Sequence, residues 1–459
     1  MPATDHEWSD GLLEAGLGDA EVAAVVGWTA RVRRMVEVEA ALGRALAGAG
    51  VIPDGAGDAI TRACDPERLD LDVLARRAAR SATPVIPLVA ALAEQAEPLA
   101  AAWLHHGATS QDVVDTATVL QLREALALLD RRLADAADHA AELARRHRDT
   151  VMAGRTLGQQ AVPTTFGLLA ARWLGALARR REQLAVLRTR VLVVQLGGSV
   201  GTRAVWADRA DAVVEALAGE LQLAVPDLPW HAERDRIAEL AGALSAVAAV
   251  VGTVATDLVL LAQSELGEVA EGAGEGPGSS AMPHKRNPVH ATAARAAARL
   301  AQGECSLLLQ ATAGHELERA AGAWQAEWVA LPSALVRTTG AVTRLGAALQ
   351  GLEVDPARMR ANLAANLGLT GSEALATVLS PALGRVDAQA LVGELAARAA
   401  TQRRALAEVA AQDERVRAVL ALDELTAALD PTAVVAQVAP LVDRALAAYA
   451  RPRPTPEVP

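Results

Sequence analysis

Residues 111–146 read QDVVDTATVLQLREALALLDRRLADAADHAAELARR, and their apolar side chains recur every three or four positions. The main stripe consists of Val119, Leu122, Leu126, Leu129, Leu133, Ala136, Ala140 and Leu143. A period near 3.5 residues predicts a long helix that packs almost parallel to its neighbours, as in helix bundles. A second row widens the stripe: Leu120, Ala127, Ala134 and Ala141. We therefore expect this helix to be buried on two sides and the chain to form an oligomer.

Two further segments show the same period. The second contains Trp173, Leu177, Leu184, Leu187, Val191 and Val194, with an interruption at Arg180. The third contains Ile237, Leu240, Leu244, Val247, Val251, Val254, Leu258 and Leu261. At about 1.5 Å per residue, each of the three helices should run for roughly 40–55 Å. Strand signals are sparse, and the valine-rich run 191–194 is assigned to the second helix. The sequence therefore predicts an all-α fold with a long central helix bundle.

Shorter helices are expected on both sides of this region. Residues 1–110 are punctuated by proline-containing turns, and short helices resume after the break at Asp355 and Pro356. The proline-rich tail from residue 451 cannot continue a helix and should be loose. We therefore divide the chain into three helical domains: an N-terminal domain at 1–110, the long-helix bundle at 111–353 and a C-terminal domain at 354–459.

The bulk composition excludes several classes of function. A net charge of −11 repels phosphate backbones, and an aromatic content of 2% leaves few stacking platforms for bases, so nucleic acid is not an expected partner. Cys64 and Cys305 lie far apart and are predicted to be free thiols in a reducing compartment. The apolar segments are broken by charges, and the N-terminus lacks a signal peptide. We expect a soluble, cytoplasmic protein without a membrane-spanning segment.

Two polar clusters flank the first long helix. Residues 105–112 read HHGATSQD and come directly before it. Thr109 or Ser110 is suited to capping this helix, and the same helix N-terminus could also bind a carboxylate, so the sequence leaves both roles open. Residues 154–167 read GRTLGQQAVPTTFG, and Pro163 is expected in the first turn of the next helix.

A third cluster contains the only lysine of the chain, Lys285. Residues 278–288 read GSSAMPHKRNP, and the glycine-rich segment 271–278 before them has the composition of a lid. So many hydrogen-bond donors in one loop indicate binding or catalysis. The histidines lack acidic or cysteine partners at metal-ligand spacing, and there is no phosphate-binding loop, so neither a metal nor a cofactor is expected.

Together, the three clusters resemble the active-site segments of the aspartase/fumarase superfamily, and they occur in the right order. Residues 278–288 resemble its signature, a highly specific motif, so the signature loop is taken as 272–288. The resemblance covers the chain from about residue 80 to 350. Within the superfamily, three further stretches are most similar to the bacterial 3-carboxy-cis,cis-muconate cycloisomerases of the adenylosuccinate lyase-like branch: 229–236, 315–319 and 324–328.

The resemblance implies three α-helical domains whose long helices form a twenty-helix core in a homotetramer. Each active site would combine the three clusters from three different subunits. It also implies cofactor-free chemistry on a small di- or tricarboxylate, in which a proton next to a carboxylate is removed through an aci-carboxylate intermediate. By position, the expected catalytic residues are Ser279 as the base, Lys285 and His105. The expected substrate-binding residues are Thr109, Ser110, Gln111, Thr156, Gln159, Ser280, Met282, Asn287 and Arg319.

Three histidines and four cations complete these expectations. His105 lies where adenylosuccinate lyases have a substrate-binding histidine, and the alternative is a hydrogen-bonded residue that supports the helix cap. His284 and His290 are expected to have structural roles. Because the overall negative charge opposes an anionic substrate, local cations must dominate the pocket. The candidates are Lys285, Arg286, Arg155 and Arg319.

One departure from the superfamily's sequence pattern reduces the number of reactions that the chain is expected to catalyse. Adenylosuccinate lyases have a histidine where this chain has Leu157, and that histidine assists the departure of an amine. A carboxylate, with a pKa of about 4, leaves without such help. The sequence therefore predicts a cycloisomerase that interconverts 3-carboxy-cis,cis-muconate and 4-carboxymuconolactone in protocatechuate catabolism.

Three alternatives stay open on the sequence. The first is a lyase that removes a good leaving group from a substituted succinate, such as nitrite from nitrosuccinate. Adenylosuccinate lyase activity is less favoured because of Leu157. The third alternative is an inactive helical scaffold, which is disfavoured because Ser279, Lys285 and Asn287 are all present.

Overall fold

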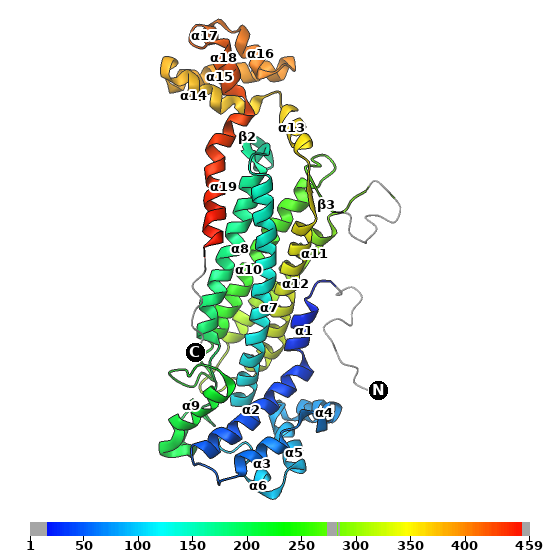
Figure 1. Cartoon of the computed structure of the whole chain (residues 1–459), viewed down its shortest axis with the longest axis vertical. Coiled ribbons are helices and arrows are strands. Elements are labelled where there is room, and N and C mark those ends of the chain that lie inside the picture. Colours follow the sequence, from blue (N-terminus) through cyan, green and yellow to red (C-terminus); the bar gives the residue numbers. More distant parts are fainter. Residues whose placement is uncertain (1–15, 273–281, 283–284, 452–459) are drawn as a thin grey trace.

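The structure is a computed structural model of the chain, and it describes residues 16–272, 282 and 285–451. A bundle of long helices occupies its long axis, and shorter helices lie at both ends (Figure 1). The predicted all-α character is confirmed for the described residues, since strands account for four short segments.

The first helices form the lower end of the molecule in Figure 1. They are α1 (Ala20–Val26), α2 (Trp28–Gly48), α3 (Ala56–Ala63), the 3-10 helix η1 (Pro66–Arg68), α4 (Leu71–Ser81), α5 (Val85–Gln95) and α6 (Pro98–Trp103). Helix α2 is the longest of them and packs against α3, α9 and the lower part of the bundle. This arrangement brings one face of α2 next to the first polar cluster.

The bundle consists of α7 (Ser110–Arg146), α8 (Phe166–Val191), α10 (Asp235–Leu261), α11 (Val289–Thr312) and α12 (Ala323–Gln350). Helix α11 packs along α10 and α12, while α7 packs along α8, α12 and α2. Along the chain, α8 is followed by the 3-10 helix η2 (Ala204–Arg209) and by α9 (Ala210–Leu221), which precede α10. Every residue of the main stripes of the first and third segments is buried, which confirms both predicted helices. The neighbours of α7 within one chain also explain its wide apolar face.

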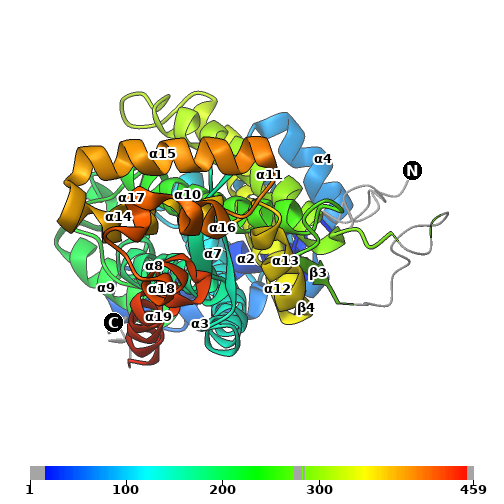
Figure 2. The same ribbon diagram turned by 90° about the horizontal axis from the view of Figure 1, so that it is seen from above.

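A separate apolar core lies at the upper end. It is built from α14 (Ser372–Leu383), α15 (Arg385–Gln402), α16 (Leu406–Gln412), α17 (Glu414–Arg417) and α18 (Leu422–Leu429). Figure 2 shows α14 to α18 lying across the end of the bundle. Helix α13 (Pro356–Ala364) and η3 (Leu369–Gly371) lead into this unit, and η4 (Pro431–Ala433) and α19 (Val434–Ala450) return along α8.

Two short antiparallel sheets complete the fold. Strands β1 (Val151–Thr156) and β2 (Gln159–Thr165) form a hairpin between α7 and α8, and β3 (Val269–Glu271) pairs with β4 (Leu352–Val354). Pro163 lies in β2, so its predicted place in the helix is wrong. Pro163 pairs with Ala153, and the register of the two strands shifts directly after Ala153, at a bulge. Proline has no N–H to donate, and a bulge is one of the places in a sheet where it is tolerated.

The assignment of residues 191–194 to a helix is also wrong beyond Val191, where α8 ends. Val193 forms a parallel bridge with Ala224 instead. The N–H of Ala224 donates to the carbonyl of Leu192, and the N–H of Val194 donates to the carbonyl of Ala224. These distant backbone bonds replace the bonds that a longer helix would have made.

The sequence predicted no membrane-spanning segment, but two described segments are long and apolar enough to cross a membrane, Asp235–Leu261 and Pro431–Ala450. The first of these is α10, whose stripe packs inside the bundle, and a core helix meets the same criterion. Cys64 and Cys305 are both free thiols, as predicted.

Gly340 marks a close approach between α12 and the start of α1. A Cβ atom at Gly340 would lie 2.6 Å from the Cα of Gly18, so Gly340→Ala must push two backbones apart. We expect a loss of about 1–3 kcal/mol in the free energy of unfolding, as for other overpacked sites. The control is Gly346→Ala on the same helix, where the added atom would meet only Ala136 at 3.9 Å. There we expect a gain of up to about 1 kcal/mol.

Thermal unfolding of the two variants beside the wild type measures this difference. Similar melting temperatures for the two variants would contradict the close contact at Gly340.

Candidate active site

Helix α7 holds the first two clusters apart. Residues 105–112 lie at its lower end, and residues 154–160 form the hairpin beyond its upper end (Figure 1). The helix has 37 residues, which at about 1.5 Å each span roughly 55 Å. The described part of the third cluster follows β3 at the side of the bundle. A single chain therefore does not bring the three clusters together.

A buried carboxylate organises the first cluster. Asp112 lies in the first turn of α7, and its Oδ1 accepts hydrogen bonds from the N–H of Gly197 at 2.8 Å and from Nε2 of His231 at 2.7 Å. Its Oδ2 accepts from the N–H of Gly198 and from that of Thr109, both at 2.9 Å. Thr109 is the N-cap residue, as predicted, but among the described residues its hydroxyl makes no capping hydrogen bond to the helix backbone. With four donors, the Asp112 carboxylate fixes the cap and the glycine loop beside it.

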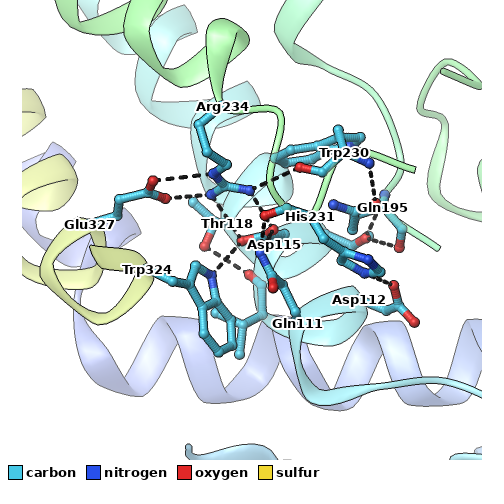
Figure 3. Close-up of polar contacts among 12 residues, drawn as sticks. Gln111, Asp112, Asp115, Thr118, Gln195, Trp230, His231, Arg234, Trp324 and Glu327 are labelled. Carbon is cyan, nitrogen blue, oxygen red and sulfur yellow. Dashed lines mark hydrogen bonds and ion pairs between the residues drawn. The ribbon is translucent and has the colours of Figure 1, made fainter. Parts of the chain in front are cut away.

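A buried charged network lies next to this carboxylate (Figure 3). Arg234, which precedes α10, sits between Asp115 of α7 and Glu327 of α12. Its Nη1 donates to Oδ2 of Asp115 at 2.7 Å, and its Nε donates to Oε1 of Glu327 at 3.2 Å. Burial by itself would lower the pKa of Arg234, but the two carboxylates raise it, so the guanidinium stays charged. The Nε1–H of Trp324 adds a bond to Asp115.

The same network reaches the connection between α11 and α12, which carries Arg319. Nε2 of His315 lies 3.0 Å from Oε1 of Glu327, which fixes the start of this connection. Arg319 then donates to Oγ1 of Thr109 at 2.7 Å and to the carbonyl of Ser199 at 2.9 Å. Thr109 and Arg319, both predicted to bind substrate, therefore lie side by side at the N-terminus of α7.

Two other residues of the first helical turns point inward. Gln111 is fully buried, and its amide donates to Oδ2 of Asp115 at 3.1 Å and to the carbonyl of His231 at 2.8 Å. Within this chain the Gln111 amide therefore supports the buried network, and its contact with substrate stays a prediction. Asp115 is a central member of the buried network, a role that sequence reasoning missed because the sequence does not indicate its distant partner Arg234.

His105 lies in the turn between α6 and α7 and has a left-handed backbone, with φ at +59°. Its Nδ1 is 2.6 Å from Oε1 of Glu39, a buried residue of α2. Burial lowers the pKa of His105, but the charge of Glu39, the hydrogen bond and the charge of Asp112 together raise it above its usual value. The ring is therefore tied to α2. Glu39 was missed by sequence reasoning, and its only signal was an acidic residue on an otherwise apolar helix face.

The second cluster forms an exposed turn at the tip of the β1–β2 hairpin. Leu157 and Gly158 have φ values of +52° and +77°, as a two-residue hairpin turn of the mirror-image type requires. The Leu157 side chain is fully exposed, and Thr156 and Gln159 on either side of the turn are exposed too. These residues face outward from the chain that carries them.

An ion pair anchors the base of this turn. Nη1 and Nη2 of Arg155 donate to the two oxygens of Glu268, at 2.9 and 2.5 Å. Nδ2 of Asn362 donates to the same carboxylate at 2.9 Å, and the Glu268 side chain is fully buried. The charge of Arg155 therefore balances that of the buried Glu268, and its expected contribution to the pocket stays a prediction.

The described part of the third cluster is exposed. Lys285, Met282 and Asn287 all present their side chains at the surface, and the N–H of Lys285 donates to the carbonyl of Met282 at 3.0 Å. The expected base and two of its neighbours lie outside the described residues: Ser279, Ser280 and His284.

Two acidic residues hold the end of this loop against the β3–β4 sheet. Arg286 pairs with Glu353 of β4 at 2.7 Å, and this hydrogen bond raises the pKa of the guanidinium. The carboxylate of Glu271 accepts the N–H groups of His290 and Ala291, at 2.9 and 2.7 Å, in the first turn of α11. Arg286 is therefore paired at the surface of this chain, and its expected role as a pocket cation stays a prediction. Among the described side chains, no group of three or more His, Cys, Asp and Glu could hold a metal ion.

Comparison with known families places this geometry in context. Residues 22–303 match a family described as "Lyase", and residues 368–445 match one described as "Adenylosuccinate lyase C-terminus". The chain belongs to the lyase family. The first match runs from α1 into α11, so both ends of α7, the hairpin and the signature loop all lie within it.

Two relatives of named activity align with almost the whole chain. A 3-carboxy-cis,cis-muconate cycloisomerase from Pseudomonas aeruginosa is 45% identical, across 95% of this chain and 96% of that protein. A nitrosuccinate lyase from Streptomyces davaonensis is 44% identical, across 95% of this chain and 94% of that protein. The crystal structure of the 3-carboxy-cis,cis-muconate lactonizing enzyme from Pseudomonas putida superposes with a TM-score of 0.89 at 40% identity, covering 95% of this chain and 98% of that one.

The buried network yields a prediction about stability. Arg234→Met would leave Asp115 and Glu327 buried without their counter-charge, and we expect a loss of about 3–5 kcal/mol in the free energy of unfolding. Arg236→Met, two residues along, is the control. Nε of Arg236 donates to the carbonyl of Arg190 at an exposed position, so we expect a change of about 0.5 kcal/mol or less.

Denaturant unfolding followed by circular dichroism measures both variants. An Arg234→Met protein as stable as Arg236→Met would show that Arg234 does not balance the two carboxylates.

Proposed function

We propose that this member of the lyase family is a 3-carboxy-cis,cis-muconate cycloisomerase that acts in aromatic catabolism in the cytoplasm. The observation that carries the proposal is the 45% identity to the Pseudomonas aeruginosa enzyme over 95% of the chain. The lactonizing enzyme of Pseudomonas putida supports it with the same fold over nearly the full length. The substrate is then a small tricarboxylate, and the chemistry needs neither metal nor cofactor.

The proposed reaction is an intramolecular addition. A carboxylate oxygen of the substrate attacks the carbon–carbon double bond β to a second carboxylate, and the electron pair moves onto that second carboxylate to give an aci-carboxylate. The hydroxyl of Ser279 then delivers a proton to the α carbon. In the reverse direction the Ser279 alkoxide removes this proton, and the ring carboxylate leaves. General acid–base catalysis of this kind contributes typically about 10²–10⁴-fold to the rate.

Fixed donors must stabilise the doubly charged aci-carboxylate. Lys285 and Asn287 are proposed to bind it, with Ser280 and Met282 completing that wall of the pocket. Thr109, Ser110 and Arg319 are proposed to bind a second carboxylate at the N-terminus of α7, where the helix dipole favours an anion. The contact of 2.7 Å between Arg319 and Thr109 supports this grouping.

We propose that the active site is shared between subunits of a homotetramer with a twenty-helix core. The length of α7 supports this, because Thr109 and Thr156 lie at opposite ends of a helix that spans roughly 55 Å. A groove of about 870 Å³ between α10 and α11, lined by small residues such as Ala248 and Gly252, leaves room for a helix of another copy. The exposed turn carrying Thr156, Leu157 and Gln159 is proposed to enter the site of a neighbouring subunit.

A second candidate is nitrosuccinate lyase activity, which the 44% identity to the Streptomyces davaonensis enzyme favours. The two reactions share the base and the carboxylate-binding groups and differ in the leaving group. Leu157 suits both, because neither a carboxylate nor nitrite needs a general acid to leave. The substrate itself must therefore decide between them.

The first test mixes the purified protein with 3-carboxy-cis,cis-muconate and follows the ultraviolet absorbance of the conjugated diene. We expect a rapid decrease and formation of the lactone without added metal or nucleotide. Ser279→Ala should slow the reaction by at least about 10²-fold, because it removes the proposed acid–base group. Its helicity and molecular mass should match those of the wild type.

The same samples are then given nitrosuccinate, and nitrite is measured. Turnover of nitrosuccinate alone would replace the cycloisomerase proposal with the second candidate. No turnover of either substrate would support the inactive scaffold, and full activity of Ser279→Ala would remove Ser279 from its proposed role.

Sharing of the site can be tested with two inactive variants, Arg319→Met at the first cluster and Ser279→Ala at the third. The two variants are mixed in equal amounts, unfolded and reassembled. If different subunits supply the two clusters, each cluster of a site is intact with a probability of one half. Both clusters are then intact in about a quarter of the sites, and about a quarter of wild-type activity should return. Separate reassembly of each variant is the control. A mixture no more active than the controls would place both clusters of each site in one subunit.

A further inference from the structure

Glu39 is a charged residue inside the core of α2. It is 1% exposed, and it lies among apolar residues that pack against α3 and α7. An ionised carboxylate is costly to bury unless it is paired. Among the residues that the structure describes, Oε1 pairs with Nδ1 of His105 and Oε2 has no hydrogen-bond partner. The His105 ring is therefore the group that balances this buried charge.

The backbone holds His105 in place for this contact. A histidine with φ at +59° occupies a strained conformation, which persists when surrounding contacts fix it. Gly107, two residues later, has no room for a side chain, since a Cβ there would lie 2.5 Å from Nε1 of Trp206. The turn is therefore packed tightly, and it directs Nδ1 toward α2 while the His105 side chain stays 20% exposed.

The other charged and titratable groups around the pair do not oppose the protonated ring. Asp112 of α7 acts on His105 with a second negative charge, and that charge is already shared among four hydrogen-bond donors. Cys64, at the end of α3, stays a neutral thiol because burial and the charge of Glu39 raise its pKa to about 12. Arg44 of α2 pairs with Glu220 at the surface.

We propose that Glu39 is a positioning residue that holds His105 as an imidazolium, with Nε2 directed into the substrate pocket at the N-terminus of α7. The inference rests on the proposed function, since it assigns the ligand of Nε2 as a carboxylate of the substrate. The imidazolium adds a fixed positive charge to those of Arg319 and Lys285, whereas Arg155 and Arg286 are each paired with a carboxylate of the protein.

The sign of the pH dependence follows from the direction of the shift. The carboxylate of Glu39 favours the protonated ring, so the imidazolium persists to a higher pH than that of an ordinary histidine. Substrate binding should be strongest below this pKa and weaken as the pH rises through it. In Glu39→Gln the amide still accepts the Nδ1–H bond but carries no charge, so the ring should lose its proton at a lower pH.

The first experiment measures His105 directly, without substrate. The exchange of its imidazole C–H with deuterium, followed by mass spectrometry of the peptide across a pH series, reports the pKa of this ring. We expect Glu39→Gln to lower the midpoint by roughly one pH unit or more, as for the loss of an adjacent carboxylate. Glu37→Gln is the matched control, because it removes the same charge from a half-buried position on α2, where Glu37 pairs with Arg34.

The second experiment measures the pH dependence of kcat and KM for 3-carboxy-cis,cis-muconate. We expect the rise of KM with pH to begin at lower pH in Glu39→Gln than in the wild type, with kcat at low pH little changed. His105→Gln should raise KM at every pH. Adding Glu39→Gln to His105→Gln should have no further effect on kcat/KM, because Glu39 acts through the ring.

The two experiments separate failure of this inference from failure of the proposed function. An unchanged His105 midpoint in Glu39→Gln would overturn the inference even if the cycloisomerase is active. A further loss caused by Glu39→Gln in the His105→Gln background would show that Glu39 has a merely structural role. If the protein does not convert the muconate, the exchange midpoint still decides whether Glu39 sets the charge of His105.

Discussion

Three long helices of this protein are joined by one guanidinium. Arg234 lies between carboxylates on α7 and α12 and immediately precedes α10, so the lower ends of these helices share a single buried contact. Buried ion pairs rarely add much net stability, but breaking one is costly, and they can select one arrangement among several of similar packing. The alanine-rich stripes of the bundle need such selection, because small side chains interlock weakly. Through His315 and Asp115, the same contact also fixes the positions of Arg319 and the cap of α7.

The unbroken length of α7 sets the geometry of the active site. A helix of 37 residues does not bend enough to bring its ends together, so the polar turn at its start and the hairpin after its end stay far apart in every copy of the chain. Chemistry that needs both segments must therefore use more than one copy. The exposed Leu157 is consistent with a site that uses a second copy. An apolar side chain held in a left-handed backbone conformation gains little from exposure to water.

The long helices were predicted well from the sequence because an uninterrupted heptad period is compatible with an α-helix and with no other regular structure. It failed at Val193, where a bridge to Ala224 ended the helix, because periodicity carries no information on distant backbone partners. The start of α7 at Thr109 was predicted because threonine and serine are preferred at the N-terminus of a helix. Glu39 and Glu268 were missed for the opposite reason. From sequence alone, an acidic residue in a helix or loop is expected to face solvent. Its burial follows only from its partner, and the partner of Glu39 lies 66 residues away along the chain.

The single lysine has a practical consequence. Every other cationic side chain is an arginine, so Lys285 carries the only ε-amino group in 459 residues, and it lies at the surface within the signature loop. Reagents selective for amines usually modify many sites on a protein and report on none of them. Here such a reagent has one side-chain target. A fluorophore or an affinity tag could therefore be attached to this loop without any engineered residue.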